Sequence, residues 1–144
     1  MFLNMLAIAV LLTLVFGKAE GQSAPAYKVE IKATLNGDTT AVVREDVRDW
    51  TTQNLPKTTE SRLARKNVKI ILTVRVVDDE TIYDLATAKA SVRWEAVGID
   101  GTVLAGGAVN NLASTGLNSR AARSLALSRS LDRLATEMST FISQ

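Results

Sequence analysis

Residues 68–77 have the sequence VKIILTVRVV, an apolar stretch that organises the rest of the chain. Every second residue of it is apolar, the spacing that places side chains on one face of a β-strand. Ile71 and Val77 make the other face partly apolar. We therefore expect a central strand that is covered on much of both sides and that ends at the acidic residues 78–80.

A second alternating stretch follows the central strand. Between residues 86 and 96, apolar residues alternate with Lys, Ser, Arg and Glu, and Asp100-Gly101 is typical of a tight turn. The pattern predicts a hairpin into a strand over residues 103–105. Gly106-Gly107 is too short for a phosphate-binding loop and indicates a bulge or the end of that strand.

The region before the central strand is less uniform. Residues 28–35 alternate as a half-buried strand does, and Asn36-Gly37 is a hairpin signal that would let residues 40–43 pair back as a second strand. Helical spacing in the same region favours a different structure, a helix over residues 40–54 with Asp38 or Thr39 as its cap. The apolar positions at this spacing are Val43, Val47 and Trp50.

We prefer the helix, which Pro56 would end because the residue before a proline avoids the helical region. Residues 57–67 are then predicted to be a polar connection with one helical turn around Leu63.

The carboxy-terminal segment predicts a long helix from Asn118 or Ser119 to Ser143. Its apolar residues recur in steps of four and three, which places them on one helical face. They are Leu127, Leu131, Leu134, Met138 and Phe141 or Ile142. A single apolar stripe indicates a single partner, which we expect to be the sheet.

The expected order of strand, helix, three strands and helix predicts an α+β fold. In this two-layer sandwich, two helices, one of them the long carboxy-terminal helix, cover one face of a mostly antiparallel sheet of three to five strands. After a signal peptide at residues 1–21, residues 22–144 are long enough for one domain with one core.

The signal peptide is predicted from the apolar run of residues 6–16, which matches the core of such a peptide and is shorter than a membrane-spanning helix. Ala19 and Gly21 favour cleavage before Gln22. Residues 1–5 contain neither Lys nor Arg, so an uncleaved amino-terminal anchor is the alternative. We expect a periplasmic or secreted protein.

The composition excludes several chemistries. The chain has no histidine and no cysteine, which excludes Ser-His-Asp catalysis, Cys-His catalysis, ordinary zinc sites and disulfides. Its net charge of +2 comes from interleaved acids and bases, so we do not expect binding to nucleic acid. We predict a protein without a cofactor or metal that is not an enzyme, and we name no catalytic residue.

Two groups of charged residues are candidates for function. An acidic group at 78–80 and 84 has the oxygen ligands that calcium prefers, but its spacing matches no calcium loop, and solvated charge at a strand end is the preferred interpretation. A basic group is the candidate interaction surface for an acidic partner or for peripheral contact with an anionic membrane. It consists of Arg62, Arg65, Lys66 and Lys69.

Arg120 and Arg123 stand near the start of the last helix, where the helix dipole disfavours cations. Either they have an anionic partner or they extend past the edge of the core, and we prefer the second interpretation.

The stretch from Ser91-Val92-Arg93-Trp94-Glu95 to Asp100-Gly101-Thr102-Val103, followed by a helix that begins Arg120-Ala121-Ala122-Arg123, resembles small bacterial envelope proteins of the lipopolysaccharide-assembly and curli-secretion lipoprotein type. The resemblance covers about the last sixty residues. It implies a hairpin before a long terminal helix, and a plug, scaffold or adaptor function. The chain departs from those proteins at the cleavage site, where it lacks their lipidated cysteine.

The leading functional hypothesis is a non-enzymatic periplasmic adaptor that binds another cell-envelope protein through a sheet edge or the open sheet face. The alternative is an exported carrier of a small molecule or lipid, with an apolar pocket between helix and sheet.

Overall fold

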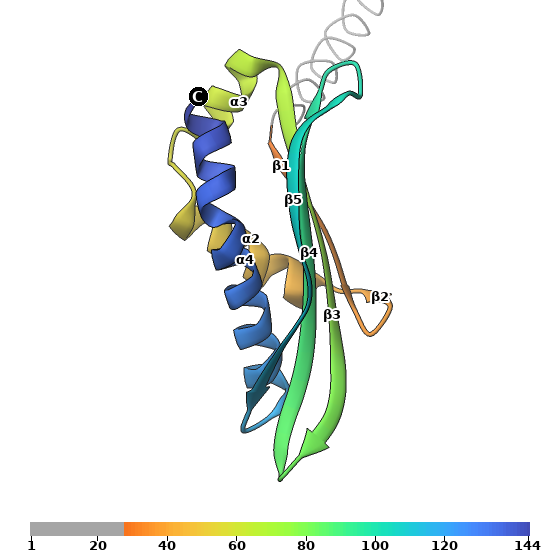
Figure 1. Ribbon diagram of the computed structural model, residues 1–144. Coiled ribbons are helices and arrows are strands. Elements are labelled where there is room, and N and C mark those ends of the chain that lie inside the picture. The colour runs from red at the N-terminus through yellow and green to blue at the C-terminus, as the bar shows by residue number, and fades with distance from the viewer. Residues whose placement is uncertain (1–27) are drawn as a thin grey trace, which may run out of the picture.

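The computed structural model describes residues 28–144, in which one five-stranded sheet carries three helices on one face (Figure 1). The predicted signal peptide and its alternative, the anchor, lie outside these residues. The elements are β1 (Val29–Leu35), β2 (Asp38–Thr39), α2 (Ala41–Asn54), α3 (Thr59–Lys66), β3 (Val68–Ile82), β4 (Leu85–Gly98), β5 (Val103–Gly116) and α4 (Ser119–Ser143). The predicted α+β sandwich is confirmed, with one helix more than expected.

The strands are arranged in the order β2-β1-β3-β4-β5, so β3 is central as predicted. β1 and β3 are parallel, with Val29 beside Ile70, and every other pair is antiparallel. The strand does not end at the acidic residues, because β3 continues to Ile82. Backbone pairing with β4 extends that far, and charged side chains there are solvated on a projecting hairpin rather than placed over the core.

The turn at Asn36-Gly37 is confirmed, since both residues have the positive φ that this hairpin requires. The strand that it begins is only two residues long, and the chain then enters α2, so the preference for a helix over a strand in residues 40–54 is correct. The predicted caps are wrong. Asp38 and Thr39 pair with β1, and Thr40 occupies the cap position without a side-chain hydrogen bond.

The connection before β3 contains a two-turn helix, α3, instead of a single helical turn. Leu63 at its centre is fully buried in the core, which holds this otherwise polar helix in place. Asn67 ends it with a left-handed backbone (φ 53°), a common way to terminate a helix.

The long helix α4 runs from Ser119 to Ser143, and the Asn118 side chain caps it by accepting a hydrogen bond from the Ala121 N–H. Its predicted stripe is the buried face, in which Ile142 is fully buried and Phe141 is half-buried. α4 packs mainly on β4 and β5, whereas α2 lies against β1 (Figure 1).

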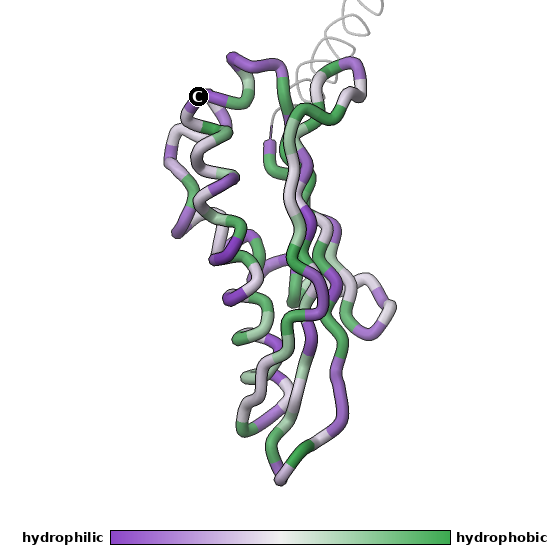
Figure 2. Tube along the Cα trace, in the orientation of Figure 1, coloured by the Kyte–Doolittle hydropathy of each residue, from purple (hydrophilic) through white to green (hydrophobic). Residues whose placement is uncertain are grey.

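The core lies between the helices and the sheet. The strand residues that alternate with the core residues, and so face the other side of the sheet, are mainly polar. Figure 2 shows hydrophilic and hydrophobic residues alternating along the strands. The expectation that β3 is covered on much of both sides is therefore wrong: Ile71 is half-buried and Val77 is exposed on the open face. Among residues 28–144, no helix has both the length and the apolar content needed to cross a membrane.

The predicted Asp100-Gly101 turn is confirmed, with the Gly98 N–H donating to the Thr102 carbonyl at 2.8 Å. β5 does not end at the paired glycines but continues to Gly116. A Cβ atom at position 107 would lie 2.5 Å from the Glu137 side chain and 2.9 Å from the Trp94 side chain. The glycine at this position of β5 therefore leaves room for both α4 and Trp94.

Candidate binding groove at the edge of the sheet

A surface groove of about 1160 Å³ lies where β1, the end of α2 and the loop after it meet the end of β4. Its apolar lining comes from three different segments of the chain, which the fold brings together. These residues are Val29, Ile31, Leu55, Pro56, Val97 and Ile99. Leu55 and Val97 are buried, Val29 and Ile31 are half-buried, and Ile99 is 81% exposed. The floor is therefore apolar surface that water partly contacts.

The walls of the groove are predominantly basic. Five cations line it against two carboxylates: Lys28, Arg44, Arg48, Lys57 and Lys69 against Glu30 and Glu60. Lys69 and Glu30 form an exposed ion pair at 3.4 Å, which cancels one charge of each sign. Arg44 and Arg48 are one helical turn apart on α2 and project from the same side of it. An excess of positive charge over an apolar floor suits an anionic ligand that also has apolar groups.

One wall of the groove is an unpaired strand edge. The Ile70 N–H donates to the Lys28 carbonyl, and the Asn36 N–H donates to the Val76 carbonyl. The backbone N–H and C=O groups of the even-numbered residues of β1 therefore point toward β3. The odd-numbered residues present their backbone groups to the other side. β2 pairs only with the last two residues of β1, and the Ala33 carbonyl accepts from the Thr40 N–H.

Val29 and Ile31 therefore each present one N–H and one C=O along the groove, where an extended chain can add as a new strand. Their side chains point toward the helix layer and form part of the apolar floor.

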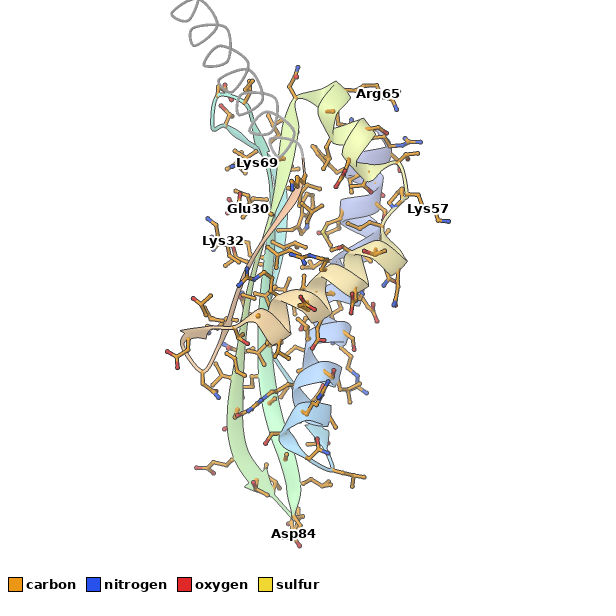
Figure 3. All side chains as sticks on the ribbon, turned by 180° about the vertical axis from the view of Figure 1, so that it is seen from behind. Glu30, Lys32, Lys57, Arg65, Lys69 and Asp84 are labelled. Carbon is orange, nitrogen blue, oxygen red and sulfur yellow. The ribbon has the colours of Figure 1, made fainter. Side chains whose placement is uncertain are left out.

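The predicted basic group is not one surface. Arg62 donates to the Thr58 hydroxyl and to the Ser143 carbonyl at the end of α4, and Lys66 lies 5.5 Å from the centre of the Phe141 ring. Both residues thus stabilise the packing of α3 on α4. Figure 3 shows Lys69 on the open side of the sheet and Arg65 at the far end of α3. Of the four residues, Lys69 alone lines the groove.

The acidic group is divided among separate contacts. Arg123 binds Asp78 with two guanidinium nitrogens, and Asn36 binds it as well, with its Nδ2 3.0 Å from Oδ2. The hydrogen bonds from Arg123 lower the pKa of Asp78. Lys89 pairs with Asp79 at 3.0 Å. Within residues 28–144, no cluster of three or more Asp or Glu side chains has a geometry that would hold a metal ion.

The preferred interpretation of the arginines near the start of α4 is wrong for one of them. Arg123 has an anionic partner, Asp78, whereas Arg120 is exposed. The partner lies in the part of β3 that was expected to be loop, so its position opposite α4 was not evident.

Three features of the groove were not predicted from the sequence: Arg44, Arg48 and the free edge of β1. The arginines have helical spacing on a predicted helix and lie off its apolar stripe, a signal that was available. The free edge had no such signal. It depends on the strand order, in which β1 has β3 on one side and on the other side only the two-residue strand β2.

No described protein family matches the sequence, and no curated protein does either. Among solved structures, the chain is similar to a homolog of neuraminyllactose-binding hemagglutinin from Helicobacter pylori, with 8% identity, a TM-score of 0.48 and coverage of 81% of this chain and 83% of that one. It is also similar to a protein assigned as a lipoprotein from Caulobacter crescentus, with 15% identity, a TM-score of 0.40 and coverage of 83% and 90%. Similarities this distant do not assign a function.

Proposed function

We propose that this chain is a non-enzymatic accessory protein of the bacterial cell envelope that binds an extended acidic segment of another envelope protein. The observation that carries the proposal is the groove, which combines a free strand edge, an apolar floor and excess positive charge. The backbone of a peptide strand on that edge would form hydrogen bonds with the N–H and C=O groups of Val29 and Ile31. Its acidic side chains would lie near Arg44 and Arg48.

The cell-envelope location rests on the predicted signal peptide. A protein exported by that route meets its partner in the periplasm or outside the cell, and the absence of cysteine is more usual in a bacterial periplasm than in a small eukaryotic secreted domain.

The carrier hypothesis has less support from the packing. An apolar pocket between α4 and the sheet would need space that the stripe of the helix fills. Leu127, Leu131, Leu134 and Met138 are each at most 4% exposed. The groove is open, and a peptide fits its strand edge better than a small molecule does.

A labelled synthetic peptide that alternates valine with glutamate tests the proposal by fluorescence anisotropy. We expect binding that weakens as salt is added, and no binding of the matching valine–lysine peptide. The double variant Arg44→Glu/Arg48→Glu removes two attractive charges and adds two repulsive ones. At about 0.2–1 kcal/mol for each exposed pair, the affinity should fall by about tenfold or more.

The matched control is Arg65→Glu, which reverses an exposed charge on α3 away from the groove and should leave binding unchanged. Val29→Pro removes a backbone donor that β3 does not use and should weaken binding while the protein still unfolds at the parent temperature. Equal binding of the two peptides, or unchanged binding by the Arg44→Glu/Arg48→Glu variant, would overturn the proposal.

The partner itself can be identified by crosslinking in envelope fractions of cells that express the full-length protein. A protein captured by the parent and by Arg65→Glu, but not by Arg44→Glu/Arg48→Glu, is the partner that the groove predicts. Intact-mass measurement of the same material tests the signal peptide, since cleavage as predicted gives a mature chain that begins at Gln22.

A further inference from the structure

The hairpin that joins β3 to β4 projects from the end of the sheet opposite the groove (Figures 1 and 3). Its apolar side chains are unusually exposed: Ile82 at 53%, Tyr83 at 95% and Leu85 at 37%. Leu117, 87% exposed, belongs to the same end of the molecule because Gly116 pairs with Ala86. We call these four side chains the apolar tip. An apolar group gathered from two distant segments at a projecting end is typical of a contact surface.

The turn of this hairpin adopts an unfavourable backbone. Tyr83 and Asp84 both have positive φ, 50° and 62°, a region that side chains other than Gly, Asn and Asp rarely enter. The hairpin between β1 and β2 makes the same kind of turn with Asn36-Gly37, the favoured residues. A tyrosine held in this conformation and almost fully exposed indicates that its position serves binding rather than folding.

The β3–β4 hairpin carries unpaired negative charge beside the apolar tip. Arg123 and Lys89 neutralise Asp78 and Asp79 farther back on the strand, whereas within residues 28–144 Glu80 and Asp84 make no ion pair. Figure 3 shows Asp84 directed away from the molecule at its very end. A surface that is apolar and acidic repels anionic lipid and fits an apolar site with a basic rim.

The groove is a site of that kind, and we propose that it binds the apolar tip of a second copy of this chain. The inference rests on the proposed function, because it takes the groove as a site for an acidic segment and assigns such a segment to the hairpin of a second copy. Tyr83 would cover the apolar floor formed by Val29, Ile31 and Leu55, and Asp84 and Glu80 would lie near Arg44 and Arg48. The charges of the hairpin and of the groove are therefore complementary, which favours a second copy of this chain as the ligand of the groove.

The contact cannot form within one chain. β3 passes beside the groove at Ile70 and reaches the tip at Ile82, and twelve residues of strand at about 3.3 Å each separate the two by about 40 Å. Tip and groove are different surfaces at opposite ends, so their association is head-to-tail, and each assembly keeps one free tip at one end and one free groove at the other. The protein should therefore form open chains whose length increases with concentration.

Sedimentation velocity over protein concentrations up to about 200 μM tests this, a range that detects weak association. The tip variant is Tyr83→Asn/Asp84→Gly, which removes the aromatic ring and a carboxylate and installs the favoured turn residues, so it should fold at least as well as the parent. The groove variant is Arg44→Glu/Arg48→Glu. We expect the parent to associate and each variant alone to be monomeric.

An equimolar mixture of the two variants gives the decisive result. The tip variant contributes an intact groove and the groove variant contributes an intact tip, so the mixture should form one-to-one dimers and nothing larger. Association of either variant alone to the extent of the parent would overturn the proposal. So would a parent that stays monomeric over the whole range.

The failures of the two proposals can be distinguished with the valine–glutamate peptide. A monomeric parent that binds this peptide retains the proposed function and lacks self-association. A parent that binds no peptide but associates through both surfaces retains the second copy as occupant and lacks a general acidic-segment site. If the monomeric parent binds phosphatidylcholine vesicles and Tyr83→Asn/Asp84→Gly does not, the tip meets a lipid surface and the self-association proposal is wrong.

Discussion

Separating Asp78 from Arg123 should measurably destabilise the fold, because this ion pair joins β3 to α4. Arg123 Nε donates to Asp78 Oδ1 at 2.6 Å, and a second guanidinium nitrogen donates to Oδ2. Asn36 binds the same carboxylate and ties the β1–β2 turn to the strand. Both charged side chains are 31% exposed, so water screens the pair only in part.

The magnitude follows from this geometry. Exposed ion pairs contribute about 0.2–1 kcal/mol, and hydrogen bonds to charged groups contribute about 1.5–3 kcal/mol. A two-nitrogen contact that is two-thirds covered lies between these cases. We expect a coupling free energy of about 1.5 kcal/mol between the two side chains.

A double-mutant cycle in urea measures the coupling directly. Asp78→Ala and Arg123→Ala should each lower the free energy of unfolding, and the double variant should lose about 1.5 kcal/mol less than the sum of the two. The lost contact with Asn36 is common to both variants that lack Asp78, so it cancels. A coupling below about 0.5 kcal/mol, the usual limit of additivity, would refute the reasoning.

The same pair sets a pH dependence. Hydrogen bonds from Arg123 hold the pKa of Asp78 below its ordinary value of 3.8. The resulting stabilisation is fully present above that ordinary, unfolded value and is lost as the pH falls through the lower pKa of the folded protein. Arg123→Ala should therefore lose less stability than the parent between pH 5 and the acid limit. Asp79 and Asp100, whose pKa values are also lowered, contribute equally to both proteins.

Four further substitutions test the packing and the Tyr83-Asp84 turn by urea or thermal unfolding. Leu131→Ala, in the buried stripe of α4, should cost about 2–5 kcal/mol, and Leu125→Ala, which is 36% exposed on the same helix, should cost clearly less; equal losses would contradict the assignment of the buried face. Gly116→Ala places a Cβ 2.7 Å from the Ala122 backbone nitrogen, so the protein should lose about 1–3 kcal/mol and its Tm should fall by roughly 4–12 °C. Tyr83→Asn should raise the Tm, because asparagine tolerates positive φ, and a lower Tm would show that the tyrosine stabilises the turn.

The elements that the sequence predicts well are those whose side chains face a single environment. α4 and α2 each bury one stripe at helical spacing, and the residues of those stripes were identified correctly. The Asp100-Gly101 turn was also predicted, because a tight turn depends on the residue types at only two adjacent positions, here including a glycine with positive φ. In these places local pattern and tertiary structure agree.

The errors occurred where neighbours in space, rather than in sequence, determine the structure. The charged end of β3 has little strand pattern, yet β4 pairs with it residue for residue as far as Asp79. The Tyr83-Asp84 turn lacks the glycine or asparagine that predicts such turns. α3 has only Leu63 to indicate a buried face, and one apolar residue defines no period.

The members of the basic group are close in sequence, but the structure does not bring all four onto one surface. Arg62 and Lys66 face α4, whereas Lys69 emerges on the other side of the sheet. The groove is assembled instead from cations that are far apart in the chain. Lys28 comes before β1 in the sequence and Lys57 comes after α2. The order of the strands and the packing of α2 on β1 bring both of them to the groove.

A difference in strand length accounts for both surfaces on which the proposals rest. β1 has seven residues and β3 has fifteen, and the two begin at the same end of the sheet. β3 therefore runs past its neighbour, and beyond Val76 it is paired with β4 alone. At the other end, β2 pairs with just the last two residues of β1 and leaves the beginning of β1 open beside α2.

Lengthening β2 would close that edge, and shortening β3 would remove the tip, without loss of the core between α4 and the sheet. An open edge and a long projecting hairpin are both features that folded proteins usually avoid, because they promote association. Their presence at opposite ends of one sheet, with opposite charge, is the arrangement that association between copies of this chain requires.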